Sequence, residues 1–106
     1  MKAISLFLFI LIASTTSSEE NNSILIYGDS ISAGYGMEKE NQWSESLKIL
    51  LSDKGFKISV YNRSISGETT GGGLTRISRI LDELKPTFLL LELGGNDALR
   101  LSLIHI

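Results

Sequence analysis

Cysteine is absent from this sequence of 106 residues, and proline and histidine each occur once. The lack of cysteine excludes disulfide frameworks, thiolate zinc sites and cysteine nucleophiles. The sequence also has no basic block: its ten lysines and arginines are outnumbered by twelve acidic residues, for a formal net charge of −2. That balance argues against a nucleic-acid partner. With 42% apolar and 21% charged residues, the chain has the composition of one small globular domain.

The first 20 residues, MKAISLFLFILIASTTSSEE, have the order of a secretory signal peptide. Lys2 precedes an unbroken run of apolar or small residues from Ala3 to Ala13, and further small residues follow as far as Ser18. The apolar run is about half of the ~20 residues that a membrane-spanning helix needs. We therefore expect residues 1–18 to be a cleaved signal peptide, with an uncleaved anchor as the alternative. The mature protein is then periplasmic or secreted and keeps no stable membrane span.

Strand and helix patterns alternate along the rest of the chain. Apolar runs at 23–28, 57–64 and 87–95 predict strands, and amphipathic segments at 42–55 and 73–86 predict helices. Apolar strands separated by helices indicate parallel pairing through right-handed crossovers. The predicted fold class is therefore α/β, a three-layer α/β/α flavodoxin-like sheet. Doubly wound sheets usually have about five strands or more, so we expect this one to be truncated after the third strand. If the strand order is 2-1-3, the third strand lies at an open edge although its sequence is that of a central strand.

Some residues within these elements carry their own expectations. We expect Trp43 to anchor the first helix in the core and the glycines of 71–73 to form a flexible loop before the second helix. Pro86 is expected to close that second helix. Its apolar face is predicted to comprise Leu74, Ile77, Ile80, Leu81 and Leu84.

Three glycine-rich polar loops follow the predicted strands: GDSISAG (28–34), SISGETTGGG (64–73) and GGNDALR (94–100). In a parallel sheet such loops emerge at the same carboxyl edge, which is the usual ligand site of this architecture. The first loop lacks the glycine spacing of a dinucleotide fingerprint and the Gly-Lys-Ser/Thr of a Walker loop. It also lacks the second glycine of the G-x-S-x-G elbow. A flavodoxin-type phosphate loop remains open for SISAG, so a non-catalytic phosphate- or flavin-binding module is the alternative function.

The segments GDSISAGYG, NRSISGETTGGGLTRI and LLLELGGNDALR resemble, in order and spacing, the first three sequence blocks of the GDSL or SGNH hydrolases. The resemblance is strongest to the exported thioesterase I, lysophospholipase L1 and arylesterase branch, and it runs from about residue 23 to Arg100. It implies a serine esterase or thioesterase, similar to lysophospholipases and arylesterases, that hydrolyses the acyl ester or thioester bonds of small molecules without a metal or organic cofactor. It also implies that Ser30 is the nucleophile and that the Ser30 and Gly67 amides and the Asn96 side chain form the oxyanion hole.

Each of these residues also has a purely structural interpretation. Ser30 can act as a helix N-cap, whereas a nucleophile needs its hydroxyl held clear of a rigid strand-to-helix turn. Gly67 lacks a Cβ, so its amide can approach an acyl carbon closely. Asn96 can be part of a simple turn, and we expect Asp97 to cap the helix that follows. Asp29 is expected to organise its own turn by accepting backbone hydrogen bonds.

The general base that a serine nucleophile requires is not evident in the sequence. The resemblance places it in an Asp-x-x-His block much nearer the C-terminus of the family's domain. The single histidine, His105, follows Asn96 by nine residues, and the residue three before it is Ser102 rather than aspartate. We therefore do not expect His105 to be the base, and we expect the 106-residue chain by itself to be inactive.

The last six residues, LSLIHI, depart from the family pattern, which usually continues with glycine after the GGNDxLR block. They match the translation of a transposase-type sequencing adapter. We therefore expect residues 101–106 to be non-native and residues 19–100 to be the N-terminal part of an SGNH hydrolase domain.

Overall fold

The computed structural model describes residues 22–104, and side chains as far as residue 101. The expected signal peptide at 1–18 and the single histidine, His105, lie outside the described residues. The elements are, in chain order, β1 (Asn22–Gly28), α2 (Ser30–Ala33), the 3₁₀ helix η1 (Lys39–Asn41), α3 (Trp43–Asp53), β2 (Ile58–Asn62), α4 (Thr70–Leu84), β3 (Phe88–Glu92) and α5 (Gly95–Ile104). Within the described part of the chain, no helix is long and apolar enough to cross a membrane.

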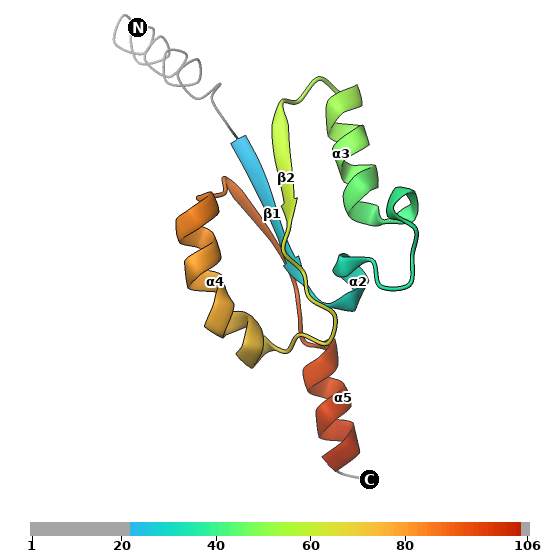
Figure 1. Ribbon diagram of the computed structural model, residues 1–106, viewed down its shortest axis with the longest axis vertical. Coiled ribbons are helices and arrows are strands. Elements are labelled where there is room, and N and C mark those ends of the chain that lie inside the picture. Colours follow the sequence, from blue (N-terminus) through green and yellow to red (C-terminus); the bar gives the residue numbers. More distant parts are fainter. Residues whose placement is uncertain (1–21, 105–106) are drawn as a thin grey trace, which may run out of the picture.

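The three strands form one parallel sheet, as the apolar runs and their connecting helices predict, and their order is β2-β1-β3. In the register of this sheet, Ile26 of β1 lies between Asn62 of β2 and Leu90 of β3. Figure 1 shows α2 and α5 at the carboxyl ends of the strands, with α5 extending away from the sheet. The predicted α/β class is confirmed, and the strand order is the one that leaves the third strand at an edge.

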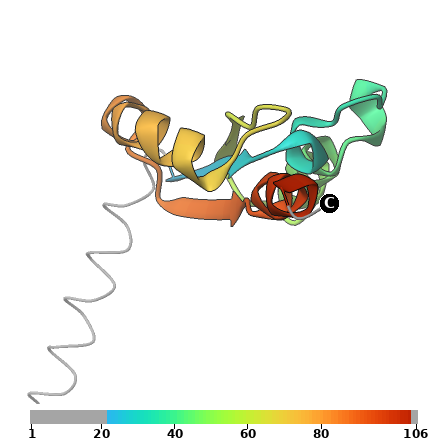
Figure 2. The ribbon, with the colours of Figure 1, turned by 90° about the horizontal axis from the view of Figure 1, so that it is seen from below.

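Helices cover both faces of the sheet. Since successive side chains of a strand point to opposite faces, contacts of neighbouring positions identify which helix lies on which side. On one face, the Tyr27 hydroxyl donates to the carbonyl of Gly73 in α4, with an O–O distance of 2.5 Å. On the other face, Asn62 of β2 donates from Nδ2 to the carbonyl of Ser32 in α2 at 2.7 Å. Figure 2 shows α4 lying along one side of β1 and β3, and the helices and sheet together make three layers.

The core of the described residues is centred on β1. Leu25, Ile26 and Tyr27 are at most 1% exposed, and Ile24 is 9% exposed. The residues of β3 are equally apolar, but Phe88–Leu91 are 40–60% exposed. The third strand therefore lies at an open edge of this sheet, as expected.

Helix α4 begins at Thr70, three residues earlier than predicted, and the glycines of 71–73 belong to its first turn. The expectation of a flexible loop there is wrong, because Thr69 caps the helix by accepting from the Gly72 amide at 3.2 Å. Gly73 is buried, and a Cβ on it would lie 2.8 Å from Leu93 and 3.4 Å from Tyr27. The lack of a side chain thus lets α4 approach the sheet closely. The helix ends at Leu84, before Pro86.

Two apolar side chains are more exposed than predicted. Trp43 is 37% exposed because it is the first residue of α3, where the chain enters from the exposed η1 segment, so the expected core position is wrong. Leu74 of α4 is 76% exposed. It lines an apolar cavity together with Leu91 and Leu93. This cavity lies beside β3, which is an edge strand of the sheet formed by residues 22–104. The other four positions of the predicted α4 face are half-buried.

Candidate functional site

Ser30 is the first residue of α2, directly after the central strand of the sheet. The residue that caps this helix is Asp29, whose Oδ1 accepts from the Ile31 amide at 3.0 Å. Asp29 therefore accepts a backbone hydrogen bond in its own turn, as expected. Because Asp29 is the N-cap of α2, Ser30 is not. Helix α2 ends after one turn at Gly34, which adopts the left-handed conformation with φ of 78°. Ser30 therefore stands on a short, rigidly closed turn.

Glu92, at the end of β3, fixes this turn from one side. Its Oε1 accepts from the hydroxyl of the buried Ser32 at 2.7 Å and from the Asp29 amide at 3.3 Å. Asn62 at the end of β2 holds the same turn from the other side through the Ser32 carbonyl. Glu92 was not predicted from the sequence, although a carboxylate that ends the apolar run LLLE is a signal that could have identified it.

The loop between β2 and α4 is attached to the end of β1 at Gly28. The Gly28 amide donates to Ser64 Oγ at 3.0 Å, and its carbonyl accepts from the Ile65 amide at 3.0 Å. A Cβ on Gly28 would lie 2.7 Å from the Glu92 carbonyl and carboxylate oxygens, so only glycine fits between the two strand ends. Gly67 follows in this loop with φ of 83°. A Cβ there would contact nothing within 4 Å, so within this chain glycine is required by its backbone conformation rather than by crowding.

The start of α5 is joined to the same loop by Asn96 and Asp97. Asn96 Nδ2 donates to the carbonyl of Glu68 at 2.9 Å. Asp97 accepts from the Thr70 amide at 2.9 Å and from the Thr70 hydroxyl at 2.8 Å. The Thr70 amide, as the largest cause, lowers the pKa of Asp97 from its ordinary value of 3.8. The expectation that Asp97 caps its own helix is wrong, since it lies inside α5 and binds the beginning of α4.

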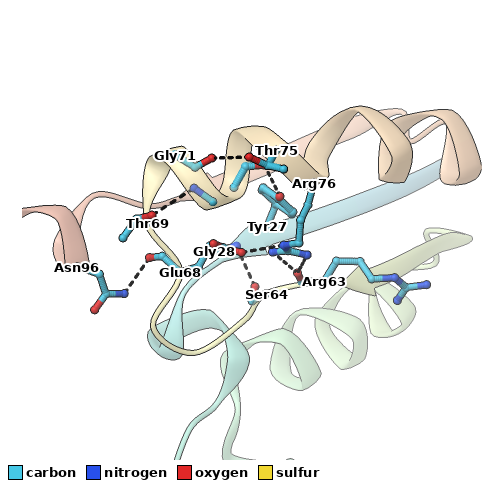
Figure 3. A network of polar contacts seen from close by, with 12 residues as sticks. Tyr27, Gly28, Arg63, Ser64, Glu68, Thr69, Gly71, Thr75, Arg76 and Asn96 are labelled. Atoms are coloured by element: carbon cyan, nitrogen blue, oxygen red, sulfur yellow. Dashed lines mark hydrogen bonds and ion pairs between the residues drawn. The ribbon is translucent and has the colours of Figure 1, made fainter.

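The three predicted site residues thus lie just after the three strands: Ser30 and Asn96 at the start of α2 and α5, and Gly67 in the loop between β2 and α4. The three segments are connected by hydrogen bonds at the carboxyl edge. Asn96 donates a hydrogen bond to the carbonyl of Glu68, which is the chain neighbour of Gly67 (Figure 3). Ser30 is connected to that loop through Gly28 and Ser64. Within residues 22–104, no cluster of three histidine, cysteine, aspartate or glutamate residues is arranged to hold a metal ion.

This arrangement places a hydroxyl and neutral N–H donors at one edge of the sheet. The Ser30 hydroxyl lies at a strand-to-helix turn, and its amide is at the first position of a helix, where no intrahelical acceptor exists. The Asn96 amide group has two N–H donors, of which the bond to Glu68 occupies one. Neutral donors that are held in place in this way can stabilise a developing oxyanion.

Comparison with known proteins agrees with this description. Residues 26–103 match the GDSL-like lipase/acylhydrolase family. An arylesterase of Vibrio mimicus is 42% identical over 100 residues, which are 94% of this chain and 49% of that protein. Thioesterase 1/protease 1/lysophospholipase L1 of Escherichia coli strain K12 is 44% identical over 95 residues, or 89% of this chain and 43% of that protein.

A crystal structure of TesA has a TM-score of 0.73 and 46% identity, and the match covers 74% of this chain and 44% of that one. The chain therefore spans less than half the length of each of these three relatives. The sequence match, the parallel sheet and the placement of the three loops lead to one conclusion: the chain belongs to the GDSL-like lipase/acylhydrolase family.

Proposed function

We propose that the protein is an exported serine esterase or thioesterase that hydrolyses acyl ester or thioester bonds of small molecules through an acyl-enzyme on Ser30. The observation that carries this proposal is the position of Ser30, the first helical residue after the buried central strand, with the Gly67 and Asn96 loops bonded to the same sheet edge. Membership of the acylhydrolase family and the names of the relatives support it.

In the proposed reaction, Ser30 Oγ attacks the acyl carbonyl carbon and its proton passes to a general base. The negative charge that develops on the carbonyl oxygen is stabilised by the amides of Ser30 and Gly67 and by Asn96 Nδ2. The bond to the leaving group then breaks, and the alcohol or thiol departs with the proton held by the base. Water attacks the acyl-enzyme in the second half of the reaction and releases the carboxylic acid.

The base is proposed to come from an Asp-x-x-His block elsewhere in the full-length gene product. Residues 22–104 contain no histidine, and the residue three before His105 is a serine. We therefore propose that the 106 residues alone do not turn over esters. We also propose that residues 19–100 are the N-terminal part of the hydrolase domain and that 101–106 are non-native. Sequencing the native locus across codon 100 tests this, and a genuine stop codon directly after Ile106 would contradict it.

Export is proposed to depend on residues 1–18 as a cleaved signal peptide, which would place the enzyme in the periplasm or outside the cell. Cell fractionation of the tagged full-length gene product tests the proposal. We expect the mature protein outside the cytoplasm and a variant that lacks residues 1–18 inside it. An uncleaved protein in the membrane fraction would contradict the proposal.

The function itself is tested by replacing the nucleophile in the full-length gene product. With p-nitrophenyl butyrate and an acyl thioester as substrates, Ser30→Ala should lower kcat on the order of 10⁴-fold or more. Ser46→Ala, at an exposed position of α3, is the matched control and should retain full activity. Unchanged turnover in Ser30→Ala, or a purified protein that is inactive and carries a bound yellow chromophore, would contradict the proposal. The chromophore would support the flavin-binding alternative.

A further inference from the structure

Arg76 of α4 and Glu68 of the β2–α4 loop form an ion pair in which Nε and Oε2 are 2.7 Å apart. Their side chains are 30% and 11% exposed, which makes this the least exposed of the ion pairs found among the described residues. Arg79 and Glu83 form a similar pair on the same helix at 3.1 Å, but they are 87% and 60% exposed. Exposed ion pairs contribute little to stability. Of these two pairs, therefore, only Arg76–Glu68 is placed to hold the β2–α4 loop against α4.

Arg76 is itself held against the core. Its guanidinium carbon lies 4.8 Å from the ring centroid of Tyr27 on the buried strand β1. Its two terminal nitrogens lie 3.5 Å from the carbonyl of Arg63, at the start of the β2–α4 loop. Tyr27 is fixed in turn by its hydrogen bond to Gly73, and burial raises the pKa of this tyrosine, so the hydroxyl remains a donor at neutral pH. Figure 3 shows Arg76 between Tyr27 and the loop.

Glu68 is fixed at three points. Its amide donates to the Ile65 carbonyl at 3.1 Å, its carboxylate binds Arg76, and its carbonyl accepts from Asn96 Nδ2. The preceding residue, Gly67, is exposed, and among residues 22–104 no atom beyond its two chain neighbours lies within 4 Å of its Cβ position. Because glycine adopts many backbone conformations at little cost, the conformation of Gly67 must be set by its neighbours.

We propose that Arg76 and Glu68 are positioning residues that align two donors of the oxyanion hole, the Gly67 amide and the Asn96 side chain. The inference rests on the proposed function. Glu68 contacts both donors, as the chain neighbour of Gly67 and as the acceptor from Asn96. The ion pair connects it to Arg76, which lies on the buried tyrosine of the central strand. Alignment of this kind matters because a displacement of about 1 Å in a catalytic group can cost on the order of 10²-fold in rate.

The test uses the full-length gene product and steady-state hydrolysis of p-nitrophenyl butyrate. Arg76→Met removes the charge and keeps most of the apolar stem. We expect kcat to fall about 10- to 100-fold with KM changed by less than about 3-fold, since an oxyanion donor acts mainly on the transition state. Arg79→Met breaks the exposed ion pair of the same helix and should leave kcat within about 2-fold of wild type. If Arg76→Met does not fold, the isosteric Glu68→Gln replaces it under the same criteria.

A second measurement separates positioning from general stabilisation. In an Asn96→Ala background, one of the two donors that Arg76 helps to align is already lost. Arg76→Met should then lower kcat by a smaller factor than in the wild-type background, because only the Gly67 amide remains to be misaligned, whereas its effect on the melting temperature should be the same in both backgrounds. An equal fall in kcat in both backgrounds, or a lower melting temperature with unchanged kcat, would overturn the inference.

Failure of the inference and failure of the proposed function give different results. If Ser30→Ala retains activity, the proposed function is wrong whatever Arg76→Met does. If Ser30→Ala is inactive while Arg76→Met keeps the wild-type kcat, the nucleophile assignment stands and the positioning role is wrong.

Discussion

Strands β1 and β3 pair with each other and have similarly apolar sequences, but they differ sharply in burial. Leu25 and Ile26 of β1 are inaccessible to solvent, whereas their partners Leu89 and Leu90 in β3 are 40% and 42% exposed. The difference follows from position: β1 has a strand on each side, and β3 has a neighbour on one side only. An apolar run therefore predicts that a strand can be buried, while the strand order decides whether it is.

The two strands also carry different parts of the candidate site. Ser30 follows the buried strand, and Asn96 follows the exposed one. The polar contacts of Glu92, Glu68 and Asp97 connect the end of β3 and the start of α5 to better packed elements. The following predictions test this division, beginning with the largest expected effect.

Shortening a leucine should be far more costly in β1 than in β3. In the chain without residues 1–18, Leu25→Ala should lower the free energy of unfolding by about 3 kcal/mol, because it leaves a cavity in the core. Leu91→Ala, at a position that is 60% exposed, should lower it by less than about 1 kcal/mol. Urea unfolding followed by circular dichroism measures both. Equal losses would mean that β3 is packed as well as β1.

Removing the Glu92 carboxylate should loosen the junction between β3 and the Ser30 turn. Glu92→Ala leaves the buried Ser32 hydroxyl and the Asp29 amide without this acceptor. We expect a loss of about 2 kcal/mol in the free energy of unfolding. Glu92→Gln keeps an acceptor oxygen and serves as the matched control, with a smaller loss. If the two variants are equally destabilised, the negative charge rather than the hydrogen bonding holds the turn.

Tyr27→Phe tests the attachment of α4 to the buried strand. The variant keeps the ring under Arg76 but loses the hydrogen bond to the Gly73 carbonyl. We expect a loss of about 1 kcal/mol in the free energy of unfolding. Tyr35→Phe, at a side chain that is 77% exposed, is the control and should have no measurable effect. A neutral Tyr27→Phe would show that the ring contacts alone hold the helix.

The smallest effect is expected at Asp97, where the start of α5 meets α4. Its folded-state pKa is lowered below 3.8, chiefly by the Thr70 amide. The contact therefore stabilises the fold above about pH 4 and is lost as the pH falls through the folded-state pKa. The difference in stability between wild type and Asp97→Asn should be present at neutral pH and vanish in acid. A difference that persists at pH 2 would contradict this.

The sequence predicted the parallel sheet well because the pairing of strands depends on general rules. Apolar runs separated by helical segments indicate parallel strands joined by right-handed crossovers. Local errors arose where tertiary contacts overrode residue type. Three glycines are poor helix formers, but the Thr69 cap and the close approach of Gly73 to Tyr27 make them helical.

The contacts that connect the site could not be predicted in the same way. The bond from Asn96 to the Glu68 carbonyl and the ion pair of Glu68 with Arg76 join residues whose proximity depends on the completed fold. Sequence patterns identified the residue types at the sheet edge through their resemblance to a family. They did not indicate which side chains hold the edge together.

The central claim is that Ser30 is the reactive hydroxyl at the carboxyl edge of the sheet. Its most direct test is to treat the full-length gene product with a fluorophosphonate and locate the adduct by peptide mass spectrometry. The account predicts a single adduct on Ser30 that is absent from Ser30→Ala and forms more slowly in Asn96→Ala. An adduct on another residue, or none in a protein that hydrolyses esters, would contradict it.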